Sequence, residues 1–436
     1  MALGGGTFTV QDKVLPGAYI NFVSAAQAST MLSDRGIVAM PLQLDWGPDG
    51  EVFSVTVDDF SRHAKSIFGY DYNAVELLPI REIFHHATKL LAFKLGVAAK
   101  AQNTFATAKY GGTRGNDIQI MIQVNVDDTT KFDVSTILAG VAVEKQTAVA
   151  NAAALQDNDF VIWKDDATLA ATAGTPLSGG TNGTITGNDY QNFLNKIESY
   201  NFHILGCPTD DSDTEKLFES FVQRMRDTVG VKFQMVGYRV SSADYEGVIS
   251  VENACIGDGE PDYGLVYWLS GLEAACSISS TCGNKEYNGE YTVSADYTQQ
   301  DLESGIWAGK LMLHRINGNL YILTDINTLI TLTPDKGTSF QNNQVVRVLD
   351  QIANDMGSLF RDKYLDKIPN DASGRSSFSS DVITYNNQLV SMGAITDFQP
   401  TNISVTQGDT KKSVVLSETI TPVAAMEQMY MTVIVN

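Results

Sequence analysis

The feature that most constrains this sequence is an apolar, β-prone segment at its C-terminal end. Residues 426–436 read Met-Glu-Gln-Met-Tyr-Met-Thr-Val-Ile-Val-Asn, and no turn or partner strand follows them. Successive side chains of a strand point to opposite faces, so both faces of this strand are largely apolar. An unpaired strand of this kind is an aggregation hazard in a monomer. We therefore predict a strand that is donated to a neighbouring subunit through Met429, Tyr430, Met431, Val433, Ile434 and Val435.

A second short β-prone run lies near the N-terminus. Residues 18–23 read Ala-Tyr-Ile-Asn-Phe-Val, follow a Pro-Gly pair, and are separated from the start by a glycine-rich leader. Two apolar terminal strands predict chains that join to one another, with an N-terminal arm at 1–24 and a C-terminal arm at 422–436. The contact residues expected in the N-terminal arm are Tyr19, Ile20, Phe22 and Val23.

The charge balance of the chain excludes some classes of partner. Asp and Glu number 51 against 30 Lys and Arg, which gives a formal charge of −21. Such acidity argues against a primary role on nucleic acid or on an anionic membrane surface. The first residues lack the basic and apolar regions of a signal peptide, and no segment reaches the run of about 18 apolar residues that spans a membrane. We therefore expect a soluble protein that is made and kept in a cytoplasm.

The length of the chain, 436 residues, allows roughly two to four domains. The order of elements predicts an α+β/α/β multidomain fold, in which an α/β core carries an inserted β-domain and the terminal strands are exchanged between subunits. Between the two arms, the expected divisions are a small α+β domain at 25–95, a β-sandwich-like domain at 96–182, an α/β core at 183–335 and a C-terminal α+β domain at 336–421.

The first half of the chain changes from helical to β character. An alternating run at 51–57 predicts a strand, and apolar residues from Ile80 to Leu91 follow helical spacing, with Pro79 at the helix start. Within 96–182 the runs 118–124 and 160–163 have strand composition and are bounded by Gly and Asn-Asp turns.

Helices and strands alternate after residue 183, which is typical of an α/β core. The expected helices are 189–200, 213–228 and 262–276, and the expected strands are 202–206, 232–237 and 247–251. The clearest helix is predicted at 344–366, where an apolar stripe from Val345 to Phe360 faces a core. Residues 382–421 return to strand-type runs, and Thr421-Pro422 marks a break before the last strand.

A search for catalytic and metal-binding motifs finds none that is convincing. The chain has no phosphate-binding loop and no Gly-x-Ser-x-Gly motif. His85 and His86 are adjacent and diverge on a helix, and the pattern Asp211-x-Asp213-x-Glu215 lacks the glycine of a calcium loop, so that helix capping explains it better. The four cysteines, Cys207, Cys255, Cys276 and Cys282, are expected to be reduced core residues. We therefore expect no catalytic residue, no metal and no cofactor, although spacing cannot exclude a pair of acidic catalytic residues.

Several stretches together resemble the tail sheath proteins of contractile phages and R-type bacteriocins, especially those of prophages in Gram-positive bacteria. The similarity spans nearly the whole chain and depends on the order and spacing of these stretches. They are Leu-Pro-Gly-Ala-Tyr-Ile at 15–20, Gly-Gly-Thr-Arg-Gly-Asn at 111–116, Leu-Ser-Gly-Gly-Thr-Asn-Gly at 177–183, Ile-Asn-Thr-Leu at 326–329, Asn-Gln-Val-Val-Arg-Val-Leu-Asp-Gln-Ile at 343–352 and Tyr-Leu-Asp-Lys-Ile-Pro-Asn at 364–370.

The resemblance implies a structural subunit that packs in stacked hexameric rings around a tail tube and shortens on triggering, driving the tube through a bacterial envelope. It implies homo-oligomers, and a tube protein, baseplate proteins and a tail terminator as partners, with assembly in the bacterial host cytoplasm and release in a phage tail or bacteriocin particle. Contraction would be a rigid-body rearrangement with the arms as hinges near Pro16, Gly17 and Pro422.

Within this reading, the C-terminal domain at 336–421 is expected to face the tube. Arg347, Arg361, Lys363 and Lys367 concentrate positive charge in an otherwise acidic chain, and we expect them to contact an acidic tube surface. The alternative is ordinary helical pairing with Asp350, Asp362 and Asp366.

Two other functions remain open from the sequence. Another self-assembling lattice, such as a surface layer or a non-contractile tail component, would also use exchanged strands, although the missing export signal weighs against a surface layer. A carboxylate-based hydrolase aimed at the cell wall would use acidic residues that a motif search does not detect.

Overall fold

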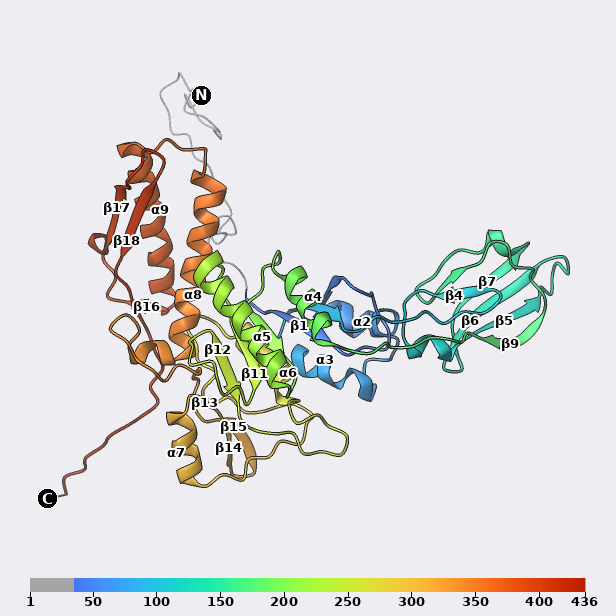
Figure 1. Ribbon diagram of the computed structural model, residues 1–436, viewed down its shortest axis with the longest axis horizontal. Helices are drawn as coiled ribbons and strands as arrows, with labels where there is room; N and C mark the ends of the chain where they lie inside the picture. The colour runs from blue at the N-terminus through green and yellow to red at the C-terminus, as the bar shows by residue number, and fades with distance from the viewer. Residues whose placement is uncertain (1–34, 436) are drawn as a thin grey trace, which may run out of the picture. The chain divides into compact units, whose positions relative to one another are not determined.

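The computed structural model describes residues 35–435 and divides into two compact units (Figure 1). One unit contains residues 35–350 together with the C-terminal segment from Pro422, and the other contains residues 351–421. The predicted N-terminal arm, with Tyr19, Ile20, Phe22, Val23 and the hinge residues Pro16 and Gly17, lies outside the described residues.

The larger unit is built on a seven-stranded sheet with the order β13-β12-β11-β10-β1-β3-β2. All neighbouring strands in it are parallel except β2, which pairs with β3 in the antiparallel direction at one edge. The strands are β1 Ile37–Leu42, β2 Val52–Thr56, β3 Lys89–Lys94, β10 Ile204–Cys207, β11 Gln234–Tyr238, β12 Val248–Val251 and β13 Lys310–Leu311. The inner strands are continuous apolar runs because a parallel sheet is buried on both faces. The predicted α/β character of the core is therefore confirmed, and its sheet also contains β1, β2 and β3 from residues 35–95.

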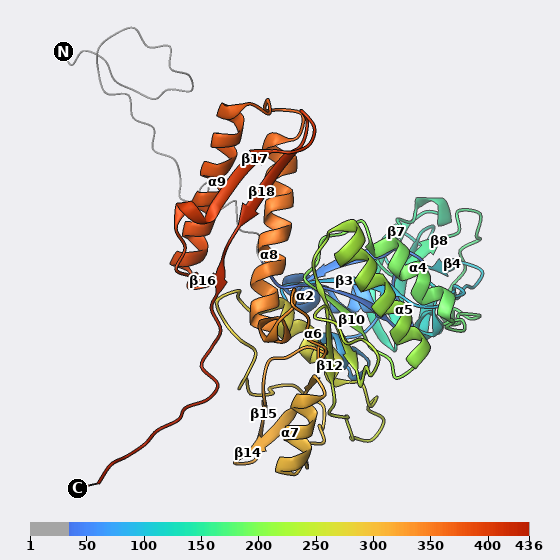
Figure 2. The same ribbon diagram turned by 60° about the vertical axis from the view of Figure 1, so that its left-hand side comes forward.

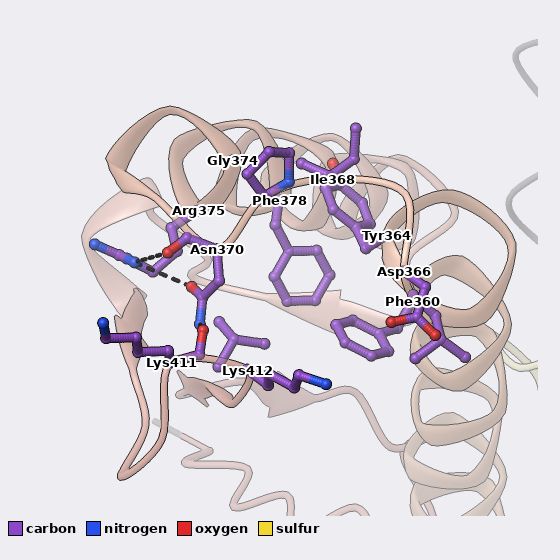
Figure 3. A pocket seen from close by; sticks show the side chains of 13 residues that line it. Phe360, Tyr364, Asp366, Ile368, Asn370, Gly374, Arg375, Phe378, Lys411 and Lys412 are labelled. Atoms are coloured by element: carbon purple, nitrogen blue, oxygen red, sulfur yellow. Dashed lines mark hydrogen bonds between the residues drawn. The ribbon is translucent and has the colours of Figure 1, made fainter.

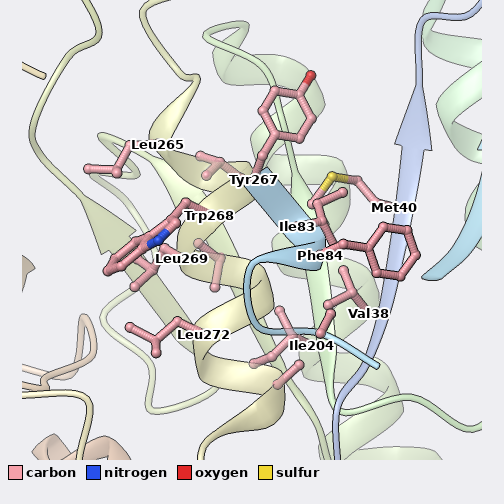
Figure 4. Close-up of a cluster of buried hydrophobic side chains, with 14 of the residues drawn as sticks. Val38, Met40, Ile83, Phe84, Ile204, Leu265, Tyr267, Trp268, Leu269 and Leu272 are labelled. Atoms are coloured by element: carbon pink, nitrogen blue, oxygen red, sulfur yellow. The ribbon is translucent and has the colours of Figure 1, made fainter. Parts of the chain in front are cut away.

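Helices cover both faces of this sheet, and the alternation of side chains along β1 shows why. Val38 and Met40 enter one apolar core, whereas Ala39 between them enters the other. In the first core, Ile83 and Phe84 of α3 lie beside Val38 and Met40, and Trp268 of α6 belongs to the same buried cluster (Figure 4). The helices of this unit are α2 Val57–Phe68, α3 Leu78–Phe84, α4 Gly187–Ile197, α5 Ser212–Gln223, α6 Leu265–Ala275 and α7 Gln299–Trp307.

The prediction of a helix from Pro79 to Leu91 is wrong in its second half. Helix α3 ends at Phe84, and Leu90 and Leu91 belong to the central strand β3. Short apolar runs have no decisive period, so that a helical spacing and a buried strand give the same sequence signal. Pairing with β1 and β2 on either side determines the strand.

A β-domain follows β3 and has its own apolar core. A four-stranded antiparallel sheet has the order β7-β6-β5-β9, and β4 pairs with β8. Its strands are β4 Ala106–Ala108, β5 Ile118–Val124, β6 Phe132–Leu138, β7 Val141–Val149, β8 Val161–Trp163 and β9 Thr172–Pro176. Ile118, Ile120 and Ile122 of β5 alternate into the core, which confirms the strand predicted at 118–124. A further hairpin pairs β14 Leu313–Ile316 with β15 Asn319–Ile322.

The smaller unit contains a helix that the sequence analysis did not predict. Helix α9 Ala372–Ser391 covers part of the region that we expected to be β-type, and it packs on β17. Ser, Thr and Asn are frequent in it and are poor helix formers. The signal that was available is the spacing of four, three and four residues between Phe378, Val382, Tyr385 and Leu389, which are all buried.

The other elements of residues 351–421, and α8, whose first residues belong to the larger unit, agree with the sequence. The predicted helix at 344–366 is α8 Asn343–Leu359, followed by a π-helical turn Phe360–Tyr364. The hairpin of β17 Ile403–Gln407 and β18 Val414–Glu418 accounts for the predicted strand runs. Two short strands, β16 Ile395–Thr396 and β19 Thr421–Pro422, complete the elements described.

Helices α3 and α6 approach closely at Gly271, so we expect this position not to tolerate a larger residue. A Cβ atom added there would lie 2.2 Å from the carbonyl oxygen of Ile83, so that α6 would have to move away from α3. We expect Gly271→Ala to lower the free energy of unfolding by about 1–3 kcal/mol in urea titrations, because overpacking forces shifts of the backbone.

Gly357→Ala in α8 is the matched control. Nothing lies within 4 Å of a Cβ added at Gly357, so we expect no loss and a gain of up to about 1 kcal/mol from helix propensity. Equal effects of the two substitutions would show that the approach of α6 to α3 does not depend on glycine.

Candidate assembly surfaces

The C-terminal arm is the most exposed apolar segment of the described chain. Residues 423–435 have no regular secondary structure, and Figures 1 and 2 show them as an extended segment. Met426 is 100% exposed, Tyr430 90% and Val435 88%. A segment with this much apolar surface is typical of an interaction site. The predicted contact residues are all exposed: Met429, Tyr430, Met431, Val433, Ile434 and Val435. Their role stays a prediction, because the strand that they would form needs a partner chain.

The base of the arm is attached to the larger unit. The backbone N–H of Ala425 donates to Oε1 of Gln344 at 3.0 Å, and the hydroxyl of Thr324 donates to Glu427 at 3.1 Å. Both contacts lie after Pro422, and residues 424–435 are nevertheless exposed. The hinge at Pro422 stays a prediction.

Arg347, expected to face a tube, is instead buried. Its side chain is 1% exposed, and Nη2 lies 2.5 Å from Glu273 and 3.3 Å from Asp325. Nη1 donates to the carbonyl oxygen of Ser280 at 2.9 Å. The polar side of α8 is covered here by other parts of the same unit, which the helical pattern of α8 alone does not reveal. The assignment of Arg347 to an outer surface is therefore corrected.

Arg347 and the two carboxyl groups beside it shift one another's pKa values. Burial raises the pKa of Glu273, and the neighbouring charge of Asp325 raises it further. Burial also acts to raise the pKa of Asp325, but Arg347 and hydrogen bonds outweigh it, so that the pKa of Asp325 lies below its usual value. Asp325 accepts from the N–H of Cys282 at 2.9 Å and from the amide of Asn343 at 2.9 Å. The Arg347 guanidinium thus contacts two carboxyl groups. The lowered pKa of Asp325 favours its ionised form, and the raised pKa of Glu273 favours its protonated form.

Two groups of acidic residues have the spacing of metal ligands within the described chain, and both already contain a cation of the protein. Arg347 lies in the group of Glu273, Cys282 and Asp325, and Arg81 pairs with Glu290 at 2.6 Å in the group of Glu82, His85 and Glu290. Burial raises the pKa of Glu82 to about 7. His86 meets Asn288 at 3.2 Å, and both histidines follow the end of α3 at Phe84, so the expectation that they lie on a helix is wrong. Cys207, Cys255, Cys276 and Cys282 are all buried and free, as predicted.

The remaining predicted cations lie on the surface of the smaller unit. Arg361 is 62% exposed beside Asp362, and Lys363 is 51% exposed with its Nζ 2.5 Å from Asp381. Lys367 is exposed and donates to the carbonyl oxygen of Asp362 at 2.6 Å. Exposed ion pairs contribute only about 0–1 kcal/mol, so a partner surface can compete for these side chains.

No helix among residues 35–435 is long and apolar enough to cross a lipid bilayer. The described residues thus combine an α/β core, an inserted β-domain, buried acidic groups neutralised by arginine, and an exposed apolar arm.

Comparison with known families identifies the class of this protein. Models of the phage tail sheath match consecutive parts of the chain: the domain III N-terminal region of tail sheath protein Gp18 at 35–95, the β-sandwich domain at 94–182, the central domain at 183–328 and the C-terminal domain at 335–436. The chain therefore belongs to the phage tail sheath family, and the resemblance seen in the sequence is confirmed.

Individual relatives agree over the full length. The chain is 31% identical to the phage-like element PBSX protein XkdK of Bacillus subtilis (strain 168), with 100% of both chains covered. The crystal structure of a sheath tail protein from Desulfitobacterium hafniense matches with a TM-score of 0.81 and 35% identity over 95% of this chain and 99% of that one. The crystal structure of a sheath tail protein from Listeria innocua matches with a TM-score of 0.80 and 31% identity, over 92% of this chain and 95% of that one. The helical sheath of the anti-feeding prophage in its contracted state has a TM-score of 0.55 at 11% identity over 97% and 99%, which shows the shared fold alone.

Proposed function

We propose that this sheath subunit polymerises around a tail tube as stacked hexameric rings and shortens on triggering, which drives the tube through a bacterial envelope. Membership of the tail sheath family supports this function. The observation that carries it is the C-terminal arm, because an apolar segment with Tyr430 90% exposed has the surface of an interaction site. The role is structural, with no catalytic step.

The arms would join subunits by strand exchange, with residues 1–24 and 422–436 each completing a sheet in a neighbour. A donated strand of about six residues makes about five ladder hydrogen bonds, worth roughly 0.5–1.5 kcal/mol each. Buried Met, Val and Ile side chains add roughly 1.5–3 kcal/mol apiece, and ordering the arm costs about 1–2 kcal/mol per residue. One exchange is modestly favourable, and many exchanges along a tube make assembly effectively irreversible.

The domains between the arms would keep the divisions read from the sequence, at 25–95, 96–182, 183–335 and 336–421. During contraction 25–95 and 183–335 would move together, because β1 and β10 pair in one sheet, and the arms would stay paired, with hinges at Pro16, Gly17 and Pro422. Baseplate proteins and a tail terminator would limit the polymer at its ends. Assembly in the host cytoplasm precedes release in a phage tail or a bacteriocin particle.

The tube contact would use Arg361, Lys363 and Lys367 against an acidic tube surface. We expect Arg361→Glu with Lys363→Glu to abolish co-assembly on purified tubes, measured by co-sedimentation and electron microscopy, yet to leave tube-free polymers intact. Wild-type co-assembly should also weaken with added salt, since exposed charges are screened.

Lys100→Glu with Lys196→Glu is the matched control, because both lysines are exposed on the larger unit and the change in charge is the same. If the control loses tube binding as well, net charge rather than this surface is responsible. Unchanged co-assembly of the Arg361 and Lys363 variant would remove these residues from the tube contact.

A further inference from the structure

The smaller unit contains an apolar pocket of about 200 Å³ between α9, the segment after α8 and the β17–β18 turn (Figure 3). Phe360, Phe378 and Val414 are among the apolar residues that line it and are called its floor. The rings of Phe360 and Tyr364 pack against Phe378 with centroid separations of 5.9 and 4.8 Å, so that aromatic contacts hold the floor in place. The pocket has room for one large apolar side chain.

The rim of this pocket is positively charged in an acidic chain. All six Lys and Arg residues of 351–421 lie within 361–375 and 411–412, the segments that line or flank the pocket. Arg375 donates to Asn370, and Lys411 and Lys412 have no ion-pair partner among residues 35–435. Asp366 is the acidic residue on the rim. The pocket therefore suits an apolar side chain that is carried by an acidic segment.

The chain itself presents such a side chain at Trp307, the last residue of α7. Trp307 is 83% exposed, whereas Trp46, Trp163 and Trp268 are at most 6% exposed. Helix α7 carries Asp301 and Glu303 and contains no lysine or arginine. Exposed tryptophan costs solvation free energy in a monomer and is enriched where interfaces form. Trp307 with Asp301 and Glu303 is called the α7 knob below.

We propose that the α7 knob of one copy docks into the cationic pocket of a second copy. The indole would enter the pocket against Phe378, and Glu303 would lie opposite Lys411 and Lys412. Knob and pocket are different surfaces of the same chain, so the contact is head-to-tail and generates rings or helical arrays rather than closed dimers. This inference rests on the proposed sheath assembly and adds a second contact that does not use the arms.

A crosslinking experiment tests the contact between the α7 knob and the pocket. It leaves Trp307 and the floor of the pocket unchanged. Ser304→Cys is introduced one helical turn before Trp307 in one population of chains and Leu365→Cys beside the pocket in another, and the two are mixed, assembled and treated with a short bismaleimide. The native cysteines are all buried. We expect crosslinked dimers, and at least a tenfold loss when Trp307→Ala is added to the Ser304→Cys chain. Val75→Cys, at a position that is 73% exposed elsewhere, replaces Ser304→Cys in the control.

Tryptophan fluorescence gives an independent measurement on the unmodified chain. Since Trp307 is the exposed tryptophan, iodide should quench its emission in the monomer and not in the polymer, with Trp307→Phe used for subtraction. Lys411→Glu with Lys412→Glu should make Trp307 accessible to iodide in the polymer again, because both cations opposite Glu303 are lost. Adding Glu303→Lys restores opposite charges and should protect Trp307 from iodide once more.

The outcomes separate this proposal from the proposed function. Polymers in which Trp307 stays as accessible as in the monomer, or in which crosslinking does not depend on Trp307, overturn the knob contact and leave the sheath assignment intact. Protection of Trp307 on tubes without a Ser304–Leu365 crosslink would assign the knob to the tube and also overturn it. A chain that assembles neither alone nor on tubes would contradict the proposed function itself.

Discussion

A chain truncated after Thr421 should remain monomeric at concentrations where the intact chain polymerises. The truncation removes the exposed apolar residues 429–435, whose burial against a neighbour is the proposed source of subunit linkage. Among residues 35–435 it removes the hydrogen bonds of the arm to Gln344 and Thr324, and it shortens the small β16–β19 pair by Pro422, so that the folded monomer should survive with a nearly unchanged melting temperature. Sedimentation velocity measures both populations directly.

Val433→Asp with Val435→Asp provides a control that keeps the length of the arm. These residues share one face of the predicted strand, and charge there prevents burial without removing any backbone hydrogen-bonding group. We expect this variant to behave like the truncated chain. Polymerisation of either variant at the wild-type concentration would show that the arm does not join the subunits.

Replacing the buried Arg347 by Met should lower the free energy of unfolding by about 3–5 kcal/mol, because it leaves buried carboxyl groups without their cation. Urea unfolding of the purified chain measures the loss. Arg361→Met is the matched control, and we expect a change within about 0.5 kcal/mol for this exposed side chain. Adding Glu273→Gln and Asp325→Asn to Arg347→Met should recover part of the stability, because the uncompensated charges are then removed.

The loss at Arg347 should depend on pH in a defined direction. In the wild type, the lowered pKa of Asp325 stabilises the fold above the unfolded-state pKa, and this contribution is lost as the pH falls. Without Arg347, burial raises the folded-state pKa values of both carboxyl groups, so that the variant gains stability as they become protonated. The difference between wild type and variant should therefore shrink as the pH falls from 7 toward 4. A constant difference would indicate that lost packing, not charge, is responsible.

The parts of the fold that were predictable from the sequence are those with local signals. The inner strands β10, β11 and β12 are short, continuous apolar runs between helices, and they were expected within two residues of where they lie. Helix α9 was missed because its serines and asparagines weaken the helical signal, although Phe378 to Leu389 keep the helical spacing.

The assembly surfaces were predictable only in part. The apolar pattern of the C-terminal arm lies within one short stretch of sequence, so the exposure of the arm could be expected from that stretch alone. Arg347 has the sequence position of a surface residue, yet residues 273 and 325, far away in the chain, cover it with carboxyl groups. The pocket behind Phe360 and Phe378 likewise depends on the hairpin at 411–414, so no single stretch of sequence reveals it.

Cryo-electron microscopy of the intact chain assembled with its tail tube protein would show directly whether the arms are exchanged. We expect six-fold rings stacked around the tube, in which residues 429–435 of each subunit form a strand within a neighbouring subunit. Monomers beside bare tubes, or a polymer in which the C-terminal arm stays on its own subunit, would contradict it.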